Sequence, residues 1–225
     1  MHVKKYSTFL FDMDGVVVDS MPSHADSWKE IFREYGLTLN DEDIFRREGM
    51  AGIDSIAEIF SEKNCQVPTT EELMSLQERK ITIFKDYNVK VFEGIRDILG
   101  CLKDNGARIG LVTGSLRRSV EHMLDYEMLS FFDAVVTVDD VKRGKPFPDP
   151  YIRALELLDS SVKDSLVIEN APMGIKAAKA AALYCVAIET TLPASYLEEA
   201  DIIVSDHCEL KSFLKSVCAT CEVSA

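Results

Sequence analysis

The sequence predicts an α/β fold: a core of parallel sheet with helices on both faces, and one inserted all-helical domain. Short apolar runs rich in β-branched and aromatic residues alternate with longer helical patterns through the second half of the chain, as they do in βαβ units. Two of these runs, IGLVT and AVVTV, are apolar throughout, which is typical of strands buried on both faces. After its first strand, the first half shows helical patterns alone.

The predicted elements of the core follow in order along the chain. The strands are Ser7–Phe11, Arg108–Thr113, Ala134–Val138, Ser165–Glu169, Tyr184–Ile188 and Ile202–Ser205. Apolar residues at helical spacing mark three helices, at Ile95, Ile98, Leu99 and Leu102, at Leu155 and Leu158, and in the alanine-rich stretch from Ile175 to Ala182. Asn105-Gly106 is a stop signal for the first of these helices.

The segment between the first two strands is far longer than a βαβ crossover needs. It carries three helical patterns, at Trp28, Ile31, Phe32 and Tyr35, at Ile53, Ile56, Ile59 and Phe60, and at Leu73, Leu76, Ile83 and Phe84. We therefore predict an inserted helical domain over residues 20–88, with residues 1–19 and 89–225 forming the α/β core.

Composition and charge exclude several classes of protein. Hydrophobic residues make up 47% and charged residues 28% of the chain, which is an ordinary globular composition. The net charge of −13 argues against binding to nucleic acid or to an anionic membrane surface. No apolar run approaches the ~18 residues of a membrane span, and Asp12 interrupts the apolar N-terminal stretch too early for a signal peptide. A cytoplasmic protein is therefore expected.

Six cysteines are too few for a disulfide scaffold in a chain of this length, so reduced thiols are expected. Cys218 and Cys221 match a CxxC pattern. We interpret this pair as part of a tail beyond the last helix. A redox or metal-binding role is the alternative, but one such pair cannot complete a zinc site.

The first strand ends in Asp12-Met13-Asp14-Gly15. Residues two apart in an extended chain point the same way, so both aspartates can face the space beyond the carboxyl end of the strand, where ligands bind in parallel α/β sheets. Two close carboxylates require either a cation between them or a raised pKa on one, and both suit phosphoryl chemistry. The alternative is a structural turn in which the aspartates cap the next helix.

Three further polar motifs follow later strands or precede helices, and so belong to the same rim of the sheet. They are Val112-Thr113-Gly114-Ser115, Gly144-Lys145-Pro146-Phe147-Pro148-Asp149 and Val167-Ile168-Glu169-Asn170. Each has a structural alternative, since Thr113, Glu169 and Asn170 can cap helices and Lys145 can be a surface charge. Together they supply a hydroxyl, a cation, an acid and an amide, which is the chemistry of a phosphate and metal site.

In the order and spacing of these four motifs the chain resembles the haloacid dehalogenase superfamily, and within it the β-phosphoglucomutase/phosphatase branch. The resemblance extends from about Tyr6 to Val217. It implies a Rossmann-like core and a mobile helical cap. It also implies that Asp12 is the nucleophile that forms an aspartyl-phosphate, and that Asp14 is the general acid/base. Thr113 and Lys145 would then hold the phosphoryl group.

The same resemblance implies a Mg²⁺ site formed by Asp12, the Asp14 carbonyl, Glu169 and Asn170. It aligns His24 and Lys80 with cap-side residues of the mutase. From the motifs themselves we expect substrate near Gly114 and Ser115, near Arg117, whose charge can steer a phosphorylated substrate inward, and near Arg47 and Glu48 of the cap loop.

Two positions depart from the family pattern. Asn170 stands where the family usually has aspartate, which removes one charge from the metal site. Gly52 aligns with the arginine that holds the distal phosphate in β-phosphoglucomutases. The Glu48-Gly49 element resembles the pyrophosphatase members, in which a cap glutamate reaches the metal.

The function predicted from the sequence is therefore a Mg²⁺-dependent phosphohydrolase acting on a small phosphorylated metabolite or on pyrophosphate. Asp14 favours phosphoryl transfer over dehalogenation, because an oxygen leaving group needs a proton. The alternative is a β-phosphoglucomutase that uses the same aspartyl-phosphate. A third hypothesis is an inactive phosphometabolite-binding protein. A monomer is assumed, and His122 and His207 are expected on the surface.

Overall fold

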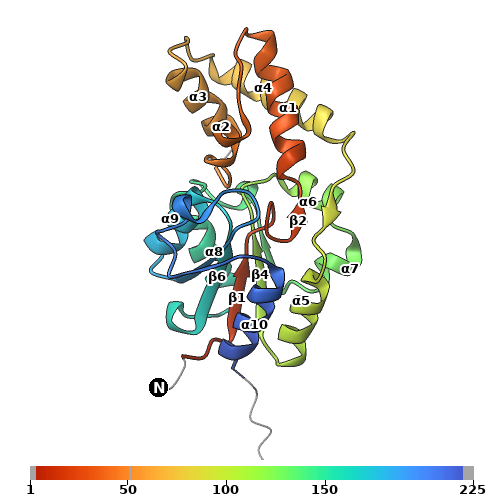
Figure 1. Ribbon diagram of the computed structural model, residues 1–225, viewed down its shortest axis with the longest axis vertical. Helices are drawn as coiled ribbons and strands as arrows, with labels where there is room; N and C mark the ends of the chain where they lie inside the picture. Colours follow the sequence, from red (N-terminus) through yellow and green to blue (C-terminus); the bar gives the residue numbers. More distant parts are fainter. Residues whose placement is uncertain (1–3, 51, 220–225) are drawn as a thin grey trace, which may run out of the picture.

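The structure is a computed structural model that describes residues 4–50 and 52–219. Its central sheet has six parallel strands in the order β5-β4-β1-β6-β7-β8 (Figure 1). The strands are β1 (Thr8–Phe11), β4 (Arg108–Val112), β5 (Ala134–Val136), β6 (Ser165–Glu169), β7 (Tyr184–Ile188) and β8 (Ile202–Val204). All six predicted strands are thus confirmed, and the predicted ends of four of them are shortened by one or two residues.

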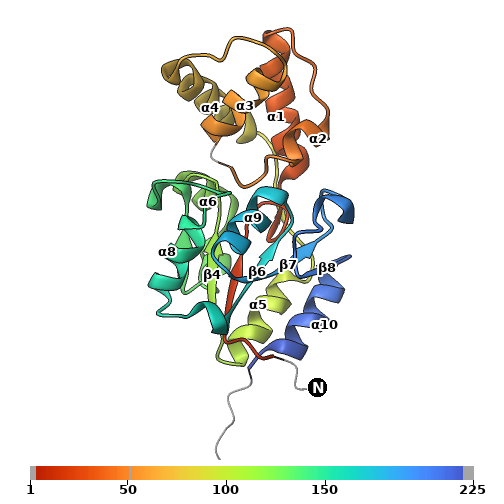
Figure 2. The ribbon, with the colours of Figure 1, turned by 90° about the vertical axis from the view of Figure 1, so that its left-hand side faces the viewer.

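Helices cover both faces of this sheet (Figure 2). On one face Phe9 and Phe11 of β1 share a buried cluster with helices α5 (Ile95–Asp104), α6 (Arg117–Met123), α7 (Tyr126–Leu129) and α10 (His207–Val217). On the other face Leu10 packs with α8 (Asp149–Leu157) and α9 (Pro172–Ala180). Successive side chains of a strand alternate between faces, so all four residues of β1 are buried because both of its faces are covered. Three short 3₁₀ segments, Val138–Asp140, Val162–Asp164 and Ala194–Tyr196, lie in the connections.

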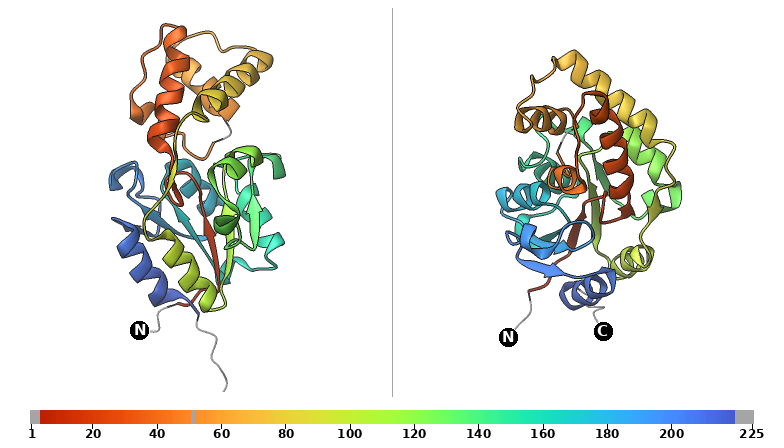
Figure 3. Two further views of the ribbon diagram at one scale, coloured as in Figure 1. Left: turned by 90° about the vertical axis from the view of Figure 1, so that its right-hand side faces the viewer. Right: turned by 45° about the horizontal axis from the view of Figure 1, so that its top comes forward.

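Four helices form a separate body above the sheet, which we call the cap (Figures 1 and 3). They are α1 (Met21–Glu34), α2 (Asp41–Phe45), α3 (Gly52–Glu62) and α4 (Thr70–Phe84). Their apolar faces meet in a hydrophobic core of their own, built around Trp28, Ile31, Phe32, Ile56 and Phe60. A short antiparallel ribbon of β2 (Val18–Asp19) and β3 (Lys90–Val91) joins the cap to the sheet. We retain residues 20–88 as the proposed extent of the cap.

Local sequence signals begin and end several of these helices. Helices α2 and α4 start with capping boxes, Asn40 with Asp43 and Thr69 with Glu72, which satisfy backbone N–H groups that have no partner within the helix. The predicted stop at Asn105-Gly106 is confirmed, since α5 ends at Asp104.

The last helix of the core, α10, ends at Val217 and is followed by Cys218. Cys221, the other half of the CxxC pair, lies outside the described residues. None of the helices in the described part of the chain is long and apolar enough to cross a membrane.

His122 is exposed, as the sequence predicts, but the prediction for His207 was wrong. His207 is half-buried at the start of α10, where its Nε2 lies 2.8 Å from the carbonyl oxygen of Val16. Its ring packs against Phe92 at 4.5 Å between ring centroids. Burial lowers the pKa of His207 from its ordinary value of 6.5, and the hydrogen bond to Val16 only partly opposes this.

We predict that His207 makes the folded protein less stable in mild acid. Its pKa is lower in the folded than in the unfolded state, so the unfolded chain binds the proton first as the pH falls below 6.5. The variant His207→Gln keeps an N–H donor for Val16 and cannot titrate. Urea unfolding from pH 7.5 to 5 should show a shallower loss of stability in this variant than in the wild type. Equal slopes would contradict this prediction.

Candidate active site

The two aspartates of the first motif lie where β1 ends at the rim of the sheet. Gly15 makes the turn that follows, with a φ of +85°, a conformation that side chains other than that of glycine rarely adopt. A Cβ atom at Gly15 would also lie 2.0 Å from Nδ2 of Asn170. Glycine at this position therefore brings the first motif into contact with the end of β6.

Lys145 joins three strand ends at the centre of the site. Its Nζ donates to Oδ1 of Asp12 at 2.5 Å, to Oε1 of Glu169 at 2.6 Å and to the carbonyl oxygen of Val112 at 3.0 Å. Burial by itself lowers the pKa of Lys145, but the carboxylates of Asp12 and Glu169 raise it above its ordinary value. Lys145 therefore stays protonated, and it is a buried site residue rather than a surface charge.

The aspartate nearest Lys145 still has an unsatisfied oxygen. Among the described residues, Oδ2 of Asp12 and Oδ1 of Asn170 are buried and have no hydrogen-bond partner. Burial raises the pKa of Asp12 to about 8, against the opposing charge of Lys145 and with support from Glu169 and Asp14. Two buried acids, Asp12 and Glu169, thus share one lysine, and Asp14 lies close enough to raise the pKa of Asp12 further. Two oxygens without partners and an excess of negative charge fit a hard cation such as Mg²⁺.

Donor atoms other than side-chain acids must contribute to such a cation site. Within the described ranges, no group of three His, Cys, Asp or Glu side chains is arranged to hold a metal. The Asn170 amide oxygen and a backbone carbonyl are therefore needed beside Asp12. Glu169 has fewer lone pairs left to bind a cation. Its Oε1 accepts from Lys145 and from the Tyr151 hydroxyl, and its Oε2 accepts from the Asn170 N–H at 3.1 Å.

Asp14 is held by a separate network of hydrogen bonds. Oδ1 accepts from Ser20 Oγ at 2.5 Å and lies 3.0 Å from His24 Nε2. Oδ2 accepts from Ser115 Oγ at 3.0 Å and from Thr113 Oγ1 at 3.5 Å. Burial would raise the pKa of Asp14, but the charge and hydrogen bond of His24 and the Ser20 hydroxyl outweigh it and lower the pKa. The two aspartates therefore sit in opposite environments: burial favours the protonated form of Asp12, whereas His24 and Ser20 favour the ionised form of Asp14.

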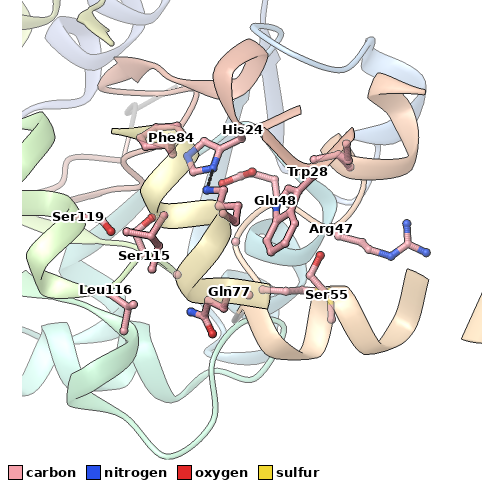
Figure 4. Close-up of a pocket in the computed structure, with 17 residues that line it drawn as sticks. His24, Trp28, Arg47, Glu48, Ser55, Gln77, Phe84, Ser115, Leu116 and Ser119 are labelled. Carbon is pink, nitrogen blue, oxygen red and sulfur yellow. Dashed lines mark hydrogen bonds between the residues drawn. The ribbon is translucent and has the colours of Figure 1, made fainter. Parts of the chain in front are cut away.

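The cap contributes His24, Lys80 and Glu48 to the same space (Figure 4). Nδ1 of His24 contacts Nζ of Lys80, and the Lys80 ammonium lies 4.4 Å from the centroid of the Phe84 ring. Burial lowers the pKa of Lys80 to about 8, although Asp14 and Glu48 oppose this shift. Burial and the charges of Asp14 and Asp12 raise the pKa of Glu48 well above its ordinary value. The cap thus reaches the end of the site that holds Asp14.

The cap loop before α3 rests directly on the core. Met50 forms a parallel β-bridge with Lys145. A Cβ atom at Gly49 would lie 2.9 Å from Cδ of Lys145, and one at Gly114 would lie 2.4 Å from the carbonyl oxygen of Gly49. These two glycines let the two backbones approach closely. A cavity of about 80 Å³ remains between cap and core, with Gly114 and Ser115 in its wall.

Two residues predicted near the substrate have acidic partners in the structure. Arg47 lines the cavity, but it donates from Nε to Glu58 at 2.8 Å and pairs with Glu62. Figure 4 shows Arg47 pointing away from His24 and Glu48. Arg117 pairs with Asp140 at 2.7 Å. The role of both residues toward a substrate stays a prediction.

Sequence reasoning missed three residues that shape the site. Tyr151 supports Glu169 from α8, Ser20 holds Asp14 from the residue before α1, and Gln77 lines the cavity from α4. Ser20 directly follows the first motif, so its position was a usable signal. Tyr151 and Gln77 fall within ordinary helical patterns, which give no sign of a site.

Comparison with known proteins agrees with this geometry. The haloacid dehalogenase-like hydrolase family matches residues 9–188. The validoxylamine A 7'-phosphate phosphatase of Streptomyces hygroscopicus subsp. limoneus is 30% identical over 208 residues, which cover 92% of this chain and 96% of the phosphatase. The pyrophosphatase PpaX of Bacillus mycoides is 31% identical over 197 residues, covering 86% of this chain and 89% of that protein.

Among solved structures, a Bacteroides vulgatus protein provisionally named a β-phosphoglucomutase superposes with a TM-score of 0.85 and 30% identity. The match covers 96% of this chain and 90% of that protein. The fold and the rim of motifs define an enzyme with a parallel α/β core and a helical cap (Figure 1). The chain belongs to the haloacid dehalogenase-like hydrolase family, and it is an enzyme of that family.

We predict that Gly114→Ala prevents the cap loop from seating on the core. The new methyl group would collide with the Gly49 carbonyl, and a small misplacement of catalytic groups costs about a hundredfold in rate. Activity should therefore fall by about that factor while the melting temperature stays near that of the wild type. Gly100→Ala, in an uncrowded position of α5, is the control and should keep full activity. Near-normal activity of Gly114→Ala would contradict the close contact.

Proposed function

We propose that this protein is a Mg²⁺-dependent phosphohydrolase that acts through an aspartyl-phosphate at Asp12. One observation carries the proposal: Lys145 occupies one carboxylate oxygen of Asp12 and leaves the other, Oδ2, without a partner in the buried site. A nucleophile needs such a fixed and unblocked oxygen. Validoxylamine A 7'-phosphate phosphatase and PpaX are relatives whose names state phosphate chemistry.

The metal would be held by Asp12, the Asp14 carbonyl, Glu169 and Asn170. Asp12 would bind the metal through Oδ1, which leaves Oδ2 free to attack. The unpaired amide oxygen of Asn170 supports this assignment, as does the pairing of two buried carboxyl groups, Asp12 and Glu169, with Lys145. When bound, Mg²⁺ supplies positive charge that offsets the Asp12 carboxylate and the substrate phosphate.

The reaction then divides into two displacements at phosphorus. In the first, Oδ2 of Asp12 forms a bond to phosphorus and the bond from phosphorus to the leaving oxygen breaks. The anionic substrate phosphate raises the pKa of Asp14, so Asp14 carries a proton at this stage and gives it to the leaving oxygen. In the second, Asp14 takes a proton from water as the water oxygen bonds to phosphorus and the Asp12 acyl-phosphate bond breaks. The products are an alcohol and phosphate, and both aspartates return to their starting states.

The remaining site residues position the phosphoryl group and exclude water. Thr113, Lys145 and Gly114 would bind its oxygens, since they lie at the same rim as Asp12. We assign Ser115 and His24 to the Asp14 side of the substrate, where both contact that carboxylate. Glu48 and Lys80 would close the cavity from the cap.

A β-phosphoglucomutase activity is the second candidate function. The structural match to the Bacteroides vulgatus protein favours it. A hydrolase and a mutase of this kind differ only in whether water or a second hydroxyl accepts the phosphoryl group. Gly52 opposes it, since the position that aligns with the phosphate-binding arginine carries no side chain, and the Gln77 carboxamide lies 3.2 Å from where a Cβ would be. An inactive binding protein is disfavoured by the assembled cluster of Asp12, Asp14 and Lys145. We further propose a monomeric cytoplasmic enzyme with a small phosphorylated substrate.

We predict that Asp12→Asn abolishes turnover of p-nitrophenyl phosphate by about a thousandfold or more, because it removes the attacking charge and keeps the shape of the side chain. Phosphate release with Mg²⁺ is the measurement. The control, Asp26→Asn, changes an exposed aspartate of α1 and should leave the rate unaltered. More than a few per cent of the wild-type rate in Asp12→Asn would exclude the covalent route.

A further prediction concerns the side-chain amide of Asn170 at the proposed metal site. Asn170→Asp adds a carboxylate where Asn170 Oδ1 has no partner, and the Thr191 hydroxyl can turn to donate to it. Mg²⁺ affinity should rise about tenfold or more, both by calorimetry and in the Mg²⁺ dependence of the rate. Asn88→Asp, an exposed position, adds the same charge away from the site and should leave affinity as it is. Equal affinity in Asn170→Asp and the wild type would remove position 170 from the metal site.

A further inference from the structure

We propose that the cap selects a neutral, hydroxyl-bearing leaving group, so that the substrates are phosphate monoesters of small polyols rather than pyrophosphate or phosphorylated acids. This inference rests on the phosphohydrolase function proposed above and names the substrate class of that site. It comes from the chemistry of one part of the cavity lining, which we call the distal wall: Gly52, Ser55, Gln77, Leu116 and Ser119.

The distal wall is continuous with the cap groups that reach Asp14. Gln77 precedes Lys80 by three residues on α4, so the two side chains lie one turn apart on the same face of the helix. Ser55 stands in the same relation to Gly52 on α3. A substrate phosphate at Asp12 therefore places its leaving group first against His24 and Lys80 and then against Gln77 and Ser55.

The cations of the cavity are already engaged. Among its described lining residues, Arg47 and Lys80 are the cationic side chains. Arg47 is buried in its pairs with Glu58 and Glu62. Lys80 contacts His24 and faces the charges of Asp14 and Glu48. A second anionic group on the substrate would find no cation of the distal wall to pair with.

The distal wall instead presents neutral hydrogen-bonding groups. Gly52 leaves room for the carboxamide of Gln77, whose Cδ and Nε2 would lie 3.2 Å from a Cβ at position 52. Ser55 adds a buried hydroxyl from α3. An amide and a hydroxyl can each donate to and accept from a substrate hydroxyl, and a site built this way discriminates strongly against substrates that lack the matching group.

Desolvation acts in the same direction. The carboxyl group of Glu48 lines the cavity and supplies no positive charge. A carboxylate or a second phosphate in the leaving group would be desolvated in the cavity without a cationic partner, which is strongly unfavourable. The cavity volume of about 80 Å³ is near half of the roughly 150 Å³ that encloses benzene. It therefore favours leaving groups of a few carbon atoms.

The first experiment compares matched substrates on the wild-type protein with Mg²⁺. Glycerol 3-phosphate and 3-phosphoglycerate share a three-carbon skeleton and differ in a distal hydroxymethyl or carboxylate group, and pyrophosphate adds a second phosphate. The value of kcat/KM for glycerol 3-phosphate should exceed that for either anionic substrate by about tenfold or more. Equal or faster hydrolysis of the anionic substrates overturns the inference, as does hydrolysis of p-nitrophenyl phosphate with no hydrolysis of glycerol 3-phosphate.

The second experiment changes the charge of the distal wall. Gln77→Lys places a cation there with little change in length, and should raise the ratio of 3-phosphoglycerate to glycerol 3-phosphate turnover by about tenfold. Gln77→Met, of similar length, is the matched control that removes the hydrogen bonds without adding a cation. It should lower glycerol 3-phosphate turnover and leave 3-phosphoglycerate turnover unchanged, whereas Gln77→Lys should raise 3-phosphoglycerate turnover. An unchanged ratio in Gln77→Lys, with a melting temperature near that of the wild type, excludes the distal wall as the selector. If Gln77→Lys does not fold, the wild-type comparison decides alone.

The two proposals fail in distinguishable ways. If no phosphate ester is hydrolysed with Mg²⁺, p-nitrophenyl phosphate included, the phosphohydrolase function itself is wrong, and the inference falls with it. If p-nitrophenyl phosphate is hydrolysed through Asp12 and the anionic substrates are preferred, the function stands and the selection of a neutral leaving group is wrong.

Discussion

The ammonium group of Lys145, held between Asp12 and Glu169, is the interaction on which the site depends. It joins the ends of β1 and β6 directly and the end of β4 through the carbonyl of Val112. Loss of one partner from a buried ion pair costs about 3–5 kcal/mol, because the remaining charges stay buried without compensation. The rim of the sheet is therefore one charged network, and Tyr151 anchors it to α8.

The same lysine connects the chemistry to the cap. Met50 bridges to the backbone of Lys145, and Gly49 packs against its side chain. The cap that carries Gln77 and Glu48 to the cavity therefore rests on the residue that fixes the nucleophile. A cap loop seated in this way can exclude water and align the leaving group in one movement. In the proposed function, these contacts of Gly49 and Met50 with Lys145 would couple the choice of substrate by the cap to the chemistry at Asp12.

The sheet and the central acids could be predicted from the sequence, whereas the directions of long charged side chains could not. Strands such as Ser165–Glu169 are buried throughout because helices cover both faces, and their central residues are apolar for that reason. The ends of the strands then locate Asp12 and Thr113 at one rim. The directions of Arg47 and Arg117 are set by ion pairs, Arg47 with Glu58 and Glu62 and Arg117 with Asp140. These acids are distant in sequence or lie on another element, so the local sequence does not indicate the pairs. His207 was misjudged because its partner, the Val16 carbonyl, is brought to it only by the fold.

The central claim is that phosphate passes through a covalent bond to Asp12. The most direct test mixes the protein with Mg²⁺ and a slowly hydrolysed phosphate ester, quenches within the first turnover, and traps the acyl phosphate by reduction before peptide mass spectrometry. The account predicts that the modification lies on Asp12 and is absent from the Asp12→Asn protein. Release of phosphate with no trapped aspartate, or with the label on a serine, threonine or histidine, would contradict it.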